Sequence, residues 1–176
     1  MPADPDPVTL VLRGDGLTLV PVRADEVEAA LAGRFDELAA ASGALVAGAG
    51  WPHADTPAAF GRLIAGGWTW LVVDGGRVVG ELGTKGPPDA AGTVEIGYGL
   101  AAASRGRGIG GRAVAVLLEA LDRRGDVRLI RAHVAPHNVA SVRLLHRLGF
   151  RQAGNAADEV VYERPATPLG KSRPTR

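Results

Sequence analysis

The chain has 176 residues, of which 46% are hydrophobic and 22% charged, and its formal net charge is +1. This length fits one domain with a real core, and the near-neutral charge carries no strong attraction to nucleic acid. The sequence contains no cysteine, which excludes disulfides and thiolate chemistry. No apolar run reaches the roughly 18–20 residues that span a bilayer, and the N-terminus lacks the basic segment of a signal peptide. We therefore expect a cytoplasmic protein that binds neither membranes nor nucleic acid.

The two ends of the chain differ in composition from its centre. Residues 1–8 are rich in proline and aspartate, and residues 165–176 hold three prolines and three basic residues. Because such segments cannot bury enough apolar surface to order themselves, both ends are predicted to be flexible. Residues 9–164 are predicted to form a single domain without internal repeats.

Hydrophobic periodicity and turn residues predict the elements of this domain in chain order. Thr56 before Pro57 is a helix N-cap followed by proline at the first helical position, and Gly75-Gly76 is a two-residue hairpin signal. The first half is expected to contain the strand Leu17–Val22, the helices Asp25–Ala32, Phe35–Ala41 and Thr56–Ala65, and the hairpin strands Trp68–Asp74 and Arg77–Thr84.

In the second half, a helical pattern over Arg112–Arg124 separates the strand Thr93–Leu100 from the strand Val127–Val134. A helix between two strands is the usual connection of a parallel pair, so these strands are predicted to run parallel. The domain is then completed by the helix Asn138–Leu148 and by two closing strands, Phe150–Ala153 and Glu159–Glu163.

The segment between that strand and its helix, Arg105-Gly106-Arg107-Gly108-Ile109-Gly110-Gly111, combines four glycines with two arginines. Glycine lacks Cβ, so the backbone can approach a ligand closely, and a helix that begins here offers unpaired N–H groups and the positive end of its dipole. The arginines add donors for phosphate oxygens. The segment therefore predicts a phosphate or pyrophosphate site, with a glycine-rich turn carrying solvated arginines as the alternative.

Three other ligand-binding motifs are not supported by the residues around the glycine segment and the two histidines. Gly106-x-Gly108-x-x-Gly111 matches the dinucleotide-binding pattern, but the next strand ends in Ala132-His133-Val134, without the carboxylate that would hold a ribose. A Walker P-loop would need Gly-Lys-Ser/Thr at its end. His133 and His137 are four residues apart, but Pro136 between them prevents a shared helix face of zinc ligands. No metal site is predicted.

A second group of residues opens the helix Asn138–Leu148. Asn138 lies at the N-cap position, and Ser141 and Leu145, three and seven residues further on, are expected to share its helix face. Taken alone, this pattern is ordinary, because asparagine is a common N-cap and a helical serine often bonds to a backbone carbonyl. Its combination with the glycine loop and with Gly149-Phe150 is more specific.

Together, Arg105-x-x-Gly108-x-Gly110, Asn138-x-x-Ser141 and Gly149-Phe150 resemble the cofactor motifs of the GNAT superfamily of N-acetyltransferases. Val94-Glu95-Ile96-Gly97-Tyr98 and Asn138-x-Ala140-Ser141 look most like the branch that contains ribosomal-protein N-terminal (alanine/serine) acetyltransferases. The resemblance is specific from Val78 to Phe150.

This resemblance implies an α/β (α+β) fold with a central mixed, mostly antiparallel twisted sheet of six to seven strands, flanked by about four helices. It also implies acetyl-CoA as co-substrate, bound at a V-shaped opening between Thr93–Leu100 and Val127–Val134. The pantetheine arm would pair with the first strand, the pyrophosphate would lie on the glycine loop, and Asn138 would reach the pantetheine or nearby backbone. The implied cofactor-binding residues are Tyr98, Gly99, Leu100, Arg105, Gly106, Arg107, Gly108, Ile109, Gly110, Gly111, Asn138 and Ser141.

One position departs from the family pattern. Many members carry a tyrosine seven residues after the motif asparagine, as general acid for the leaving thiolate, where this chain has Leu145. In the branch it resembles, a serine at the position of Ser141 is the usual substitute, so Ser141 is the first candidate acid and Tyr98 the second.

The acceptor amine must lose a proton, and a carboxylate is a reasonable base. Glu95 is the first candidate because it lies in the strand beside the expected opening, and Glu81 and Glu159 are the alternatives. An exposed or backbone-paired strand glutamate is an equally ordinary interpretation of Glu95. Positioning of the amine beside the thioester, without one essential base, is a further alternative.

The implied function is transfer of an acetyl group from acetyl-CoA to a primary amine of a small molecule or a protein N-terminus, by direct attack in a ternary complex. A non-catalytic CoA-binding sensor or interaction module is the alternative. The acceptor wall is expected from residues 30–60 and the Gly86–Ala91 loop, where Trp51 and His53 either line it or cap the core. The protein is expected to be a monomer or a homodimer.

Overall fold

The computed structural model describes residues 10–44, 50–54, 56, 57, 60 and 66–167. Within these residues one sheet of eight strands has the order β1-β2-β3-β4-β5-β6-β8-β7. Its strands are β1 (Leu12–Gly14), β2 (Leu17–Pro21), β3 (Thr69–Asp74), β4 (Arg77–Thr84), β5 (Thr93–Leu100), β6 (Leu129–Val134), β7 (Arg151–Ala156) and β8 (Glu159–Pro165).

The sheet confirms the predicted fold class. All neighbouring strands pair antiparallel except β5 and β6, which run parallel as predicted. The eighth strand, β1, was missed by the sequence prediction because it has only three residues. It is joined to β2 by Asp15-Gly16, both at positive φ, which is the backbone of a tight two-residue hairpin.

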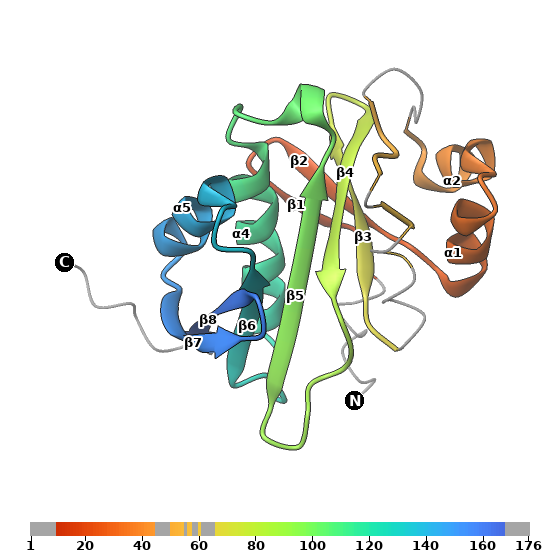
Figure 1. Cartoon of the computed structure of the whole chain (residues 1–176). Coiled ribbons are helices and arrows are strands. Elements are labelled where there is room, and N and C mark those ends of the chain that lie inside the picture. The colour runs from red at the N-terminus through yellow and green to blue at the C-terminus, as the bar shows by residue number, and fades with distance from the viewer. Residues whose placement is uncertain (1–9, 45–49, 55, 58–59, 61–65, 168–176) are drawn as a thin grey trace, which may run out of the picture.

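Helices cover both faces of the sheet. They are α1 (Ala24–Leu31), α2 (Phe35–Ser42), α4 (Ile109–Asp122) and α5 (Val139–Arg147), with α4 and α5 on one side of the sheet and α1 and α2 on the other (Figure 1). Neighbouring residues of β3 explain this arrangement, because Trp70 and Val72 pack into the core beneath α4 while Leu71 packs into the core beneath α1 and α2. None of the described helices is long and apolar enough to cross a membrane.

Three predicted segments lie wholly or partly outside the described residues. Most of the helix expected from Thr56 to Ala65 lies outside the described residues, and so do residues 1–8 and 168–176 of the two expected flexible ends. The first three residues of the expected tail are held to the domain: Pro165 ends β8, Ala166 N donates to Arg128 O at 2.9 Å and Thr167 N donates to Asp122 Oδ1 at 2.9 Å.

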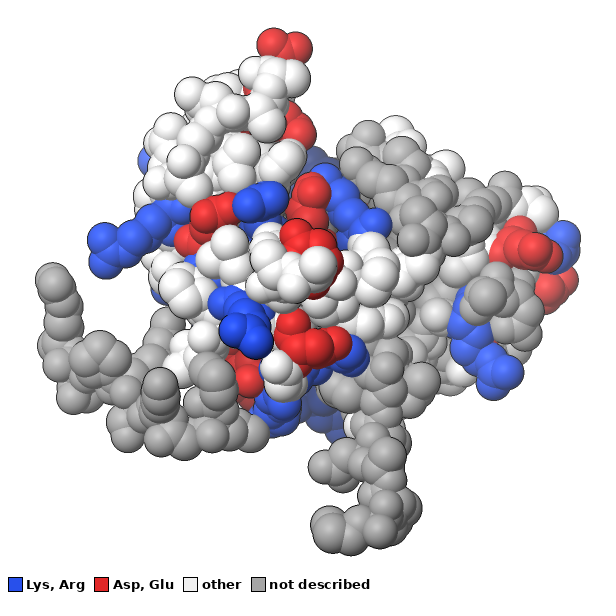
Figure 2. All heavy atoms as spheres, turned by 90° about the horizontal axis from the view of Figure 1, so that it is seen from below, with Lys and Arg blue, Asp and Glu red and all other residues white. Residues whose placement is uncertain are grey.

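Charge is distributed without a dominant sign. Figure 2, which shows the lower end of the molecule in Figure 1, has acidic and basic side chains intermixed over the described part of this face. Away from this surface, the buried Arg164 donates two hydrogen bonds, of 3.0 and 2.7 Å, to Asp122. This pair fastens the last strand to the end of α4.

Candidate functional site

The site begins where two parallel strands separate. β5 pairs with β6 only over Thr93–Ile96. Beyond Ile96, β5 stays paired with β4 and β6 stays paired with β8. The backbone of Gly97–Leu100 therefore has no strand partner on its β6 side within the described residues, and the predicted opening is present.

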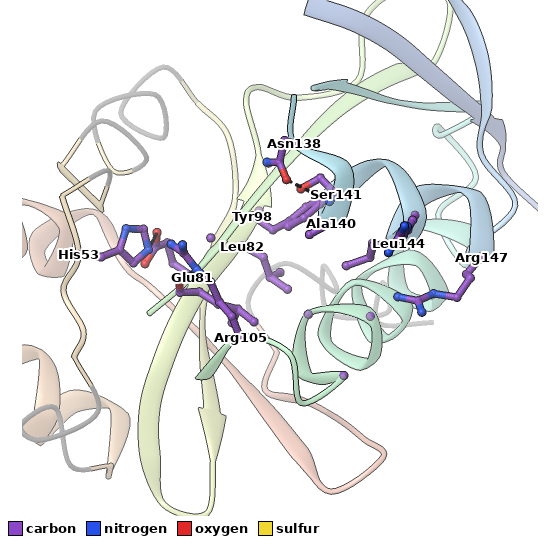
Figure 3. A pocket seen from close by; sticks show the side chains of 18 of the residues that line it. His53, Glu81, Leu82, Tyr98, Arg105, Asn138, Ala140, Ser141, Leu144 and Arg147 are labelled. Carbon is purple, nitrogen blue, oxygen red and sulfur yellow. Dashed lines mark hydrogen bonds and ion pairs between the residues drawn. The ribbon is translucent and has the colours of Figure 1, made fainter. Parts of the chain in front are cut away.

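A cavity of about 700 Å³ occupies this opening. Residues 97–100 of β5 lie between two walls of different composition (Figure 3). One wall, here called the β4 wall, comprises His53, Thr69, Glu81, Leu82, Gly83, Thr84 and Lys85. The other, here called the helical wall, comprises Arg105, Gly106, Gly108, Gly110, Gly111, Asn138, Ala140, Ser141, Arg143, Leu144 and Arg147.

The glycine loop forms the lower part of the helical wall. After a 3₁₀ turn, η2 (Ala102–Ser104), the chain passes Gly106 and Gly108, both at φ +74°, and begins α4. That left-handed backbone is accessible to glycine at little strain, and it leaves the first N–H groups of α4 at the cavity. Arg105 is held beside the loop by a hydrogen bond of 2.9 Å from Nε to Leu100 O.

Two residues of the predicted loop do not turn their side chains into the cavity. Ile109 is 1% exposed and packs in the core against the sheet. Arg107 is exposed, and its guanidinium lies 3.7 Å from Asp74 Oδ2 at the β3–β4 hairpin. Any contribution of these two residues to an anion must therefore come from their backbone.

The start of α5 forms the upper part of the helical wall. Ser141 N donates to Asn138 Oδ1 at 3.1 Å, so Asn138 caps the helix while it also lines the cavity. The expected face does not bring Leu145 into the cavity: Leu145, four residues after Ser141 in α5, is fully buried in the core, and Leu144 lines the cavity instead. Asn138 has a non-helical backbone (φ −82°, ψ 68°), so it stands outside the regular repeat of α5.

Tyr98 faces Ser141 across the opening (Figure 3). Burial raises the pKa of the Tyr98 phenol above its ordinary value, and the nearby Ser141 side chain partly opposes this rise. The Tyr98 hydroxyl is nevertheless buried without a well-aligned hydrogen-bond partner among the described residues. A phenol in this state keeps its proton at neutral pH and has it available for a group entering the cavity.

Glu95, the first candidate for a general base, does not line the cavity. Its Oε1 is paired with Lys85 Nζ and lies 4.0 Å from His133 Nδ1, which in turn is 3.7 Å from Glu159 Oε2. Glu95 and Glu159 thus belong to a charged cluster on β5, β6 and β8 beside the cavity. The sequence placed Glu95 in the correct strand, but the pairing with Lys85 depends on the adjacent β4.

Glu81, an alternative candidate, lies in the cavity wall and is 2% exposed. Its Oε2 accepts a hydrogen bond of 2.5 Å from Trp51 Nε1 and one of 3.3 Å from Thr56 Oγ1. Its Oε1 lies 3.0 Å from Nε2 of His53. Trp51 therefore does more than cap the core, because it also fixes one carboxylate oxygen of a cavity residue.

The His53–Glu81 pair lies directly against β5. A Cβ built on Gly99 would come within 2.9 Å of His53 Nε2 and 3.0 Å of Glu81 Oε1. Glycine at this position lets both polar groups approach the strand segment that has no β6 partner. Glu81 and Gly99 are also paired residues of β4 and β5.

Arg143 and Arg147 line the helical wall but were not among the predicted site residues. Their spacing of four residues, following Ser141 on the same helix, is the signal that could have identified them. Arg143 and Arg147 lie on the α5 side of the cavity, and the buried carboxylate of Glu81 lies on the opposite side, with Arg105 nearer to Glu81 (Figure 3). The cavity therefore has one wall suited to anions and another suited to a cation.

Comparison with known proteins connects this geometry to a family. The model of the acetyltransferase (GNAT) domain matches residues 16–151. No curated protein matches the chain by sequence.

Several solved structures share the fold. RimL, a ribosomal L7/L12 alpha-N-protein acetyltransferase solved with coenzyme A, superposes with a TM-score of 0.64 at 20% identity, over 89% of this chain and 98% of that one. RimJ of Mycobacterium smegmatis, solved with CoA-disulfide, gives 0.61 at 24% identity over 89% and 85%. The microcin C7 self-immunity acetyltransferase MccE, solved with acetyl-CoA and AMP, gives 0.58 at 16% over 86% and 93%.

At these identities the structural likeness establishes the fold, and the domain match, which covers more than half of the chain, establishes the family. The strand separation, the glycine loop and the capped α5 lie within or beside the matched residues. The chain belongs to the GNAT acetyltransferase family.

Proposed function

We propose that this protein transfers an acetyl group from acetyl-CoA to a primary amine, by direct attack of the amine on the thioester in a ternary complex. The observation that carries this proposal is the cavity at Gly97–Leu100, with arginines on one wall and a buried carboxylate on the other. RimL and RimJ were solved with CoA or its disulfide, and MccE with acetyl-CoA, on the same fold.

In the proposed complex, the pyrophosphate lies on the N–H groups at the start of α4, next to Arg105. Arg143 and Arg147 supply further charge to the phosphates from α5. The pantetheine arm pairs with the free backbone edge of Tyr98, Gly99 and Leu100 as an added strand would. Backbone N–H groups of this edge polarise the thioester carbonyl as the tetrahedral oxyanion develops.

The leaving thiolate needs a proton, and Ser141 and Tyr98 are the two hydroxyl groups at the appropriate place. Both line the cavity where β5 faces α5, and the raised pKa of Tyr98 favours its protonated form. A hydroxyl that bonds to the departing sulfur stabilises the charge that develops there. Leu145 has no such role, because its hydrocarbon side chain has no proton to donate and is buried in the core.

Ser141→Ala is expected to lower kcat on the order of tenfold and to leave the Kd for CoA within a few-fold. Tyr98 still offers one hydroxyl in this variant, so a double change with Tyr98→Phe should lower the rate further than either single change. Steady-state kinetics with acetyl-CoA and calorimetry with CoA measure the two quantities. An unchanged rate in Ser141→Ala would show that the sulfur takes its proton elsewhere.

The acceptor class is proposed as a protein N-terminus or a small-molecule amine. The test is release of free CoA thiol from acetyl-CoA with peptides that begin with alanine or serine, with spermidine and with kanamycin, and mass spectrometry of the products. Acetylation of at least one of these amines supports the proposal. CoA binding without thiol release from any of them would indicate the alternative, a CoA-binding module without catalysis.

A further inference from the structure

The amine must lose a proton before it attacks, so the proposed reaction requires a group that accepts this proton. We propose that His53 is the catalytic base, that Glu81 positions it and stabilises its protonated form, and that the acceptor reaches them as an alkylammonium. This role rests on the proposed function, since it concerns the same reaction in the same cavity. It replaces Glu95, which does not line the cavity.

The His53–Glu81 pair is held rigidly by its neighbours. Glu81 is 2% exposed, and its Oε2 is fixed by the indole N–H of Trp51 and the hydroxyl of Thr56. Thr56 Oγ1 also accepts a hydrogen bond of 3.1 Å from His53 N, so it holds the backbone of the histidine. The carboxylate and the imidazole are therefore held by shared contacts before any substrate binds, which is the condition for efficient proton transfer.

The hydrogen bonding of the His53 imidazole also favours a cationic ligand. His53 Nε2 lies 3.0 Å from Glu81 Oε1, but not in hydrogen-bond alignment, and neither ring nitrogen of His53 has a hydrogen-bond partner among the described residues. A buried polar atom without a partner is unfavourable, because it has lost its hydrogen bonds to water and gained none in the protein. An alkylammonium carries three N–H donors and no acceptor, so it can bond to Oε1 and Nε2 together.

The His53–Glu81 pair also lies where the reaction is proposed to occur. Both acceptor atoms lie within 3.0 Å of the position that a Cβ on Gly99 would take, at the strand edge proposed to hold the thioester. Glu81 faces His53 from β4, and β5 presents Gly99 there. The other charged groups of the cavity wall are Lys85 directly after β4, Arg105 after β5, and Arg143 and Arg147 on α5.

The proton balance of the reaction is complete with these groups. The ammonium R–NH₃⁺ transfers one proton to His53 Nε2, and the imidazolium formed is stabilised by the Glu81 carboxylate. The lone pair of R–NH₂ then forms the C–N bond, the C–S bond breaks, and the electron pair leaves on sulfur. The second proton lost from nitrogen goes to the thiolate by way of Ser141 or Tyr98. The products are R–NH–CO–CH₃ and CoA–SH, and His53 releases the first proton to solvent before the next turnover.

His53→Gln is the principal test, with the panel amine that the wild type acetylates fastest as the probe. Removing the base is expected to lower kcat/KM at neutral pH by roughly 10²–10⁴ and to leave the Kd for CoA within threefold. The loss should shrink at high pH, where more of the amine is neutral in solution. The wild type should keep its rate down to lower pH, whereas the rate of His53→Gln should follow the fraction of neutral amine and fall from the alkaline range downward, which shifts the acid limb of its profile to higher pH.

His133→Gln is the matched control, because His133 also lies beside a glutamate but outside the cavity wall. The kcat/KM of His133→Gln should stay within threefold of that of the wild type. Glu81→Gln should move the acid limb of the profile, which loss of packing alone would not do, and a melting curve for each variant reports folding.

A folded His53→Gln variant within threefold of the wild type, with a parallel pH profile, would overturn the role of His53 and leave the proposed function standing. A wild type that acetylates none of the amines but binds CoA would contradict the proposed function, and this role with it. If Glu81→Gln does not fold, the kcat/KM and the pH profile of His53→Gln still decide whether His53 is the base.

Discussion

Gly83→Ala is expected to lower the free energy of unfolding by at least about 3 kcal/mol, which is large for the addition of one methyl group. A Cβ at Gly83 would lie 1.9 Å from Trp68 O and 3.0 Å from Thr69 Cα. Both are backbone atoms, so the clash cannot be relieved by turning a side chain. The start of β3 would have to move away from β4, and Gly83 lies in the β4 wall of the cavity.

Gly154→Ala is the matched control for this prediction, because Gly154 is also a strand glycine, in β7, but a Cβ there has nothing within 4 Å. It should change the free energy of unfolding by no more than about 1 kcal/mol. Urea denaturation followed by circular dichroism measures both variants. Similar stabilities for the two would contradict the close approach of β3 to β4.

Gly108→Asp is expected to weaken CoA binding by ten- to a hundredfold, or about 1.4–2.7 kcal/mol. Gly108 is the N-cap of α4 at φ +74°, and a Cβ built there has no heavy atom within 4 Å. The carboxylate would lie at the N–H groups proposed to hold the pyrophosphate. It would repel the phosphates and compete for the same donors.

Gly108→Asn separates the charge from the shape of the new side chain. Asparagine has nearly the same size, carries no charge and tolerates the left-handed backbone. We expect a loss of no more than a few-fold for this variant, measured by calorimetry with CoA at low and at moderate salt. Since the repulsion is electrostatic, the difference between the two variants should shrink as salt rises. Equal affinities for wild type and Gly108→Asp would remove the glycine loop from the binding site.

The sequence by itself determined the order of the elements and the helical wall of the cavity, which is proposed to bind the cofactor. The pattern over Thr93–Leu100, the glycine loop and the helix after Asn138 depends on neighbours a few residues apart, so local physics is sufficient to predict it. The parallel pairing of β5 with β6 followed from the helix between them. The short strand β1 was missed because three residues are too few to show alternation.

Only the tertiary structure decided the β4 wall, which is proposed to receive the acceptor. His53 and Glu81 are 28 positions apart in the sequence and meet because the segment around Trp51 packs over β4. The pairing of Glu95 depended on Lys85 across the β4–β5 connection, and the burial of Leu145 depended on how α5 packs against the sheet. Contacts between distant segments leave no periodic trace in the chain, because they depend on how whole elements pack and not on local conformation.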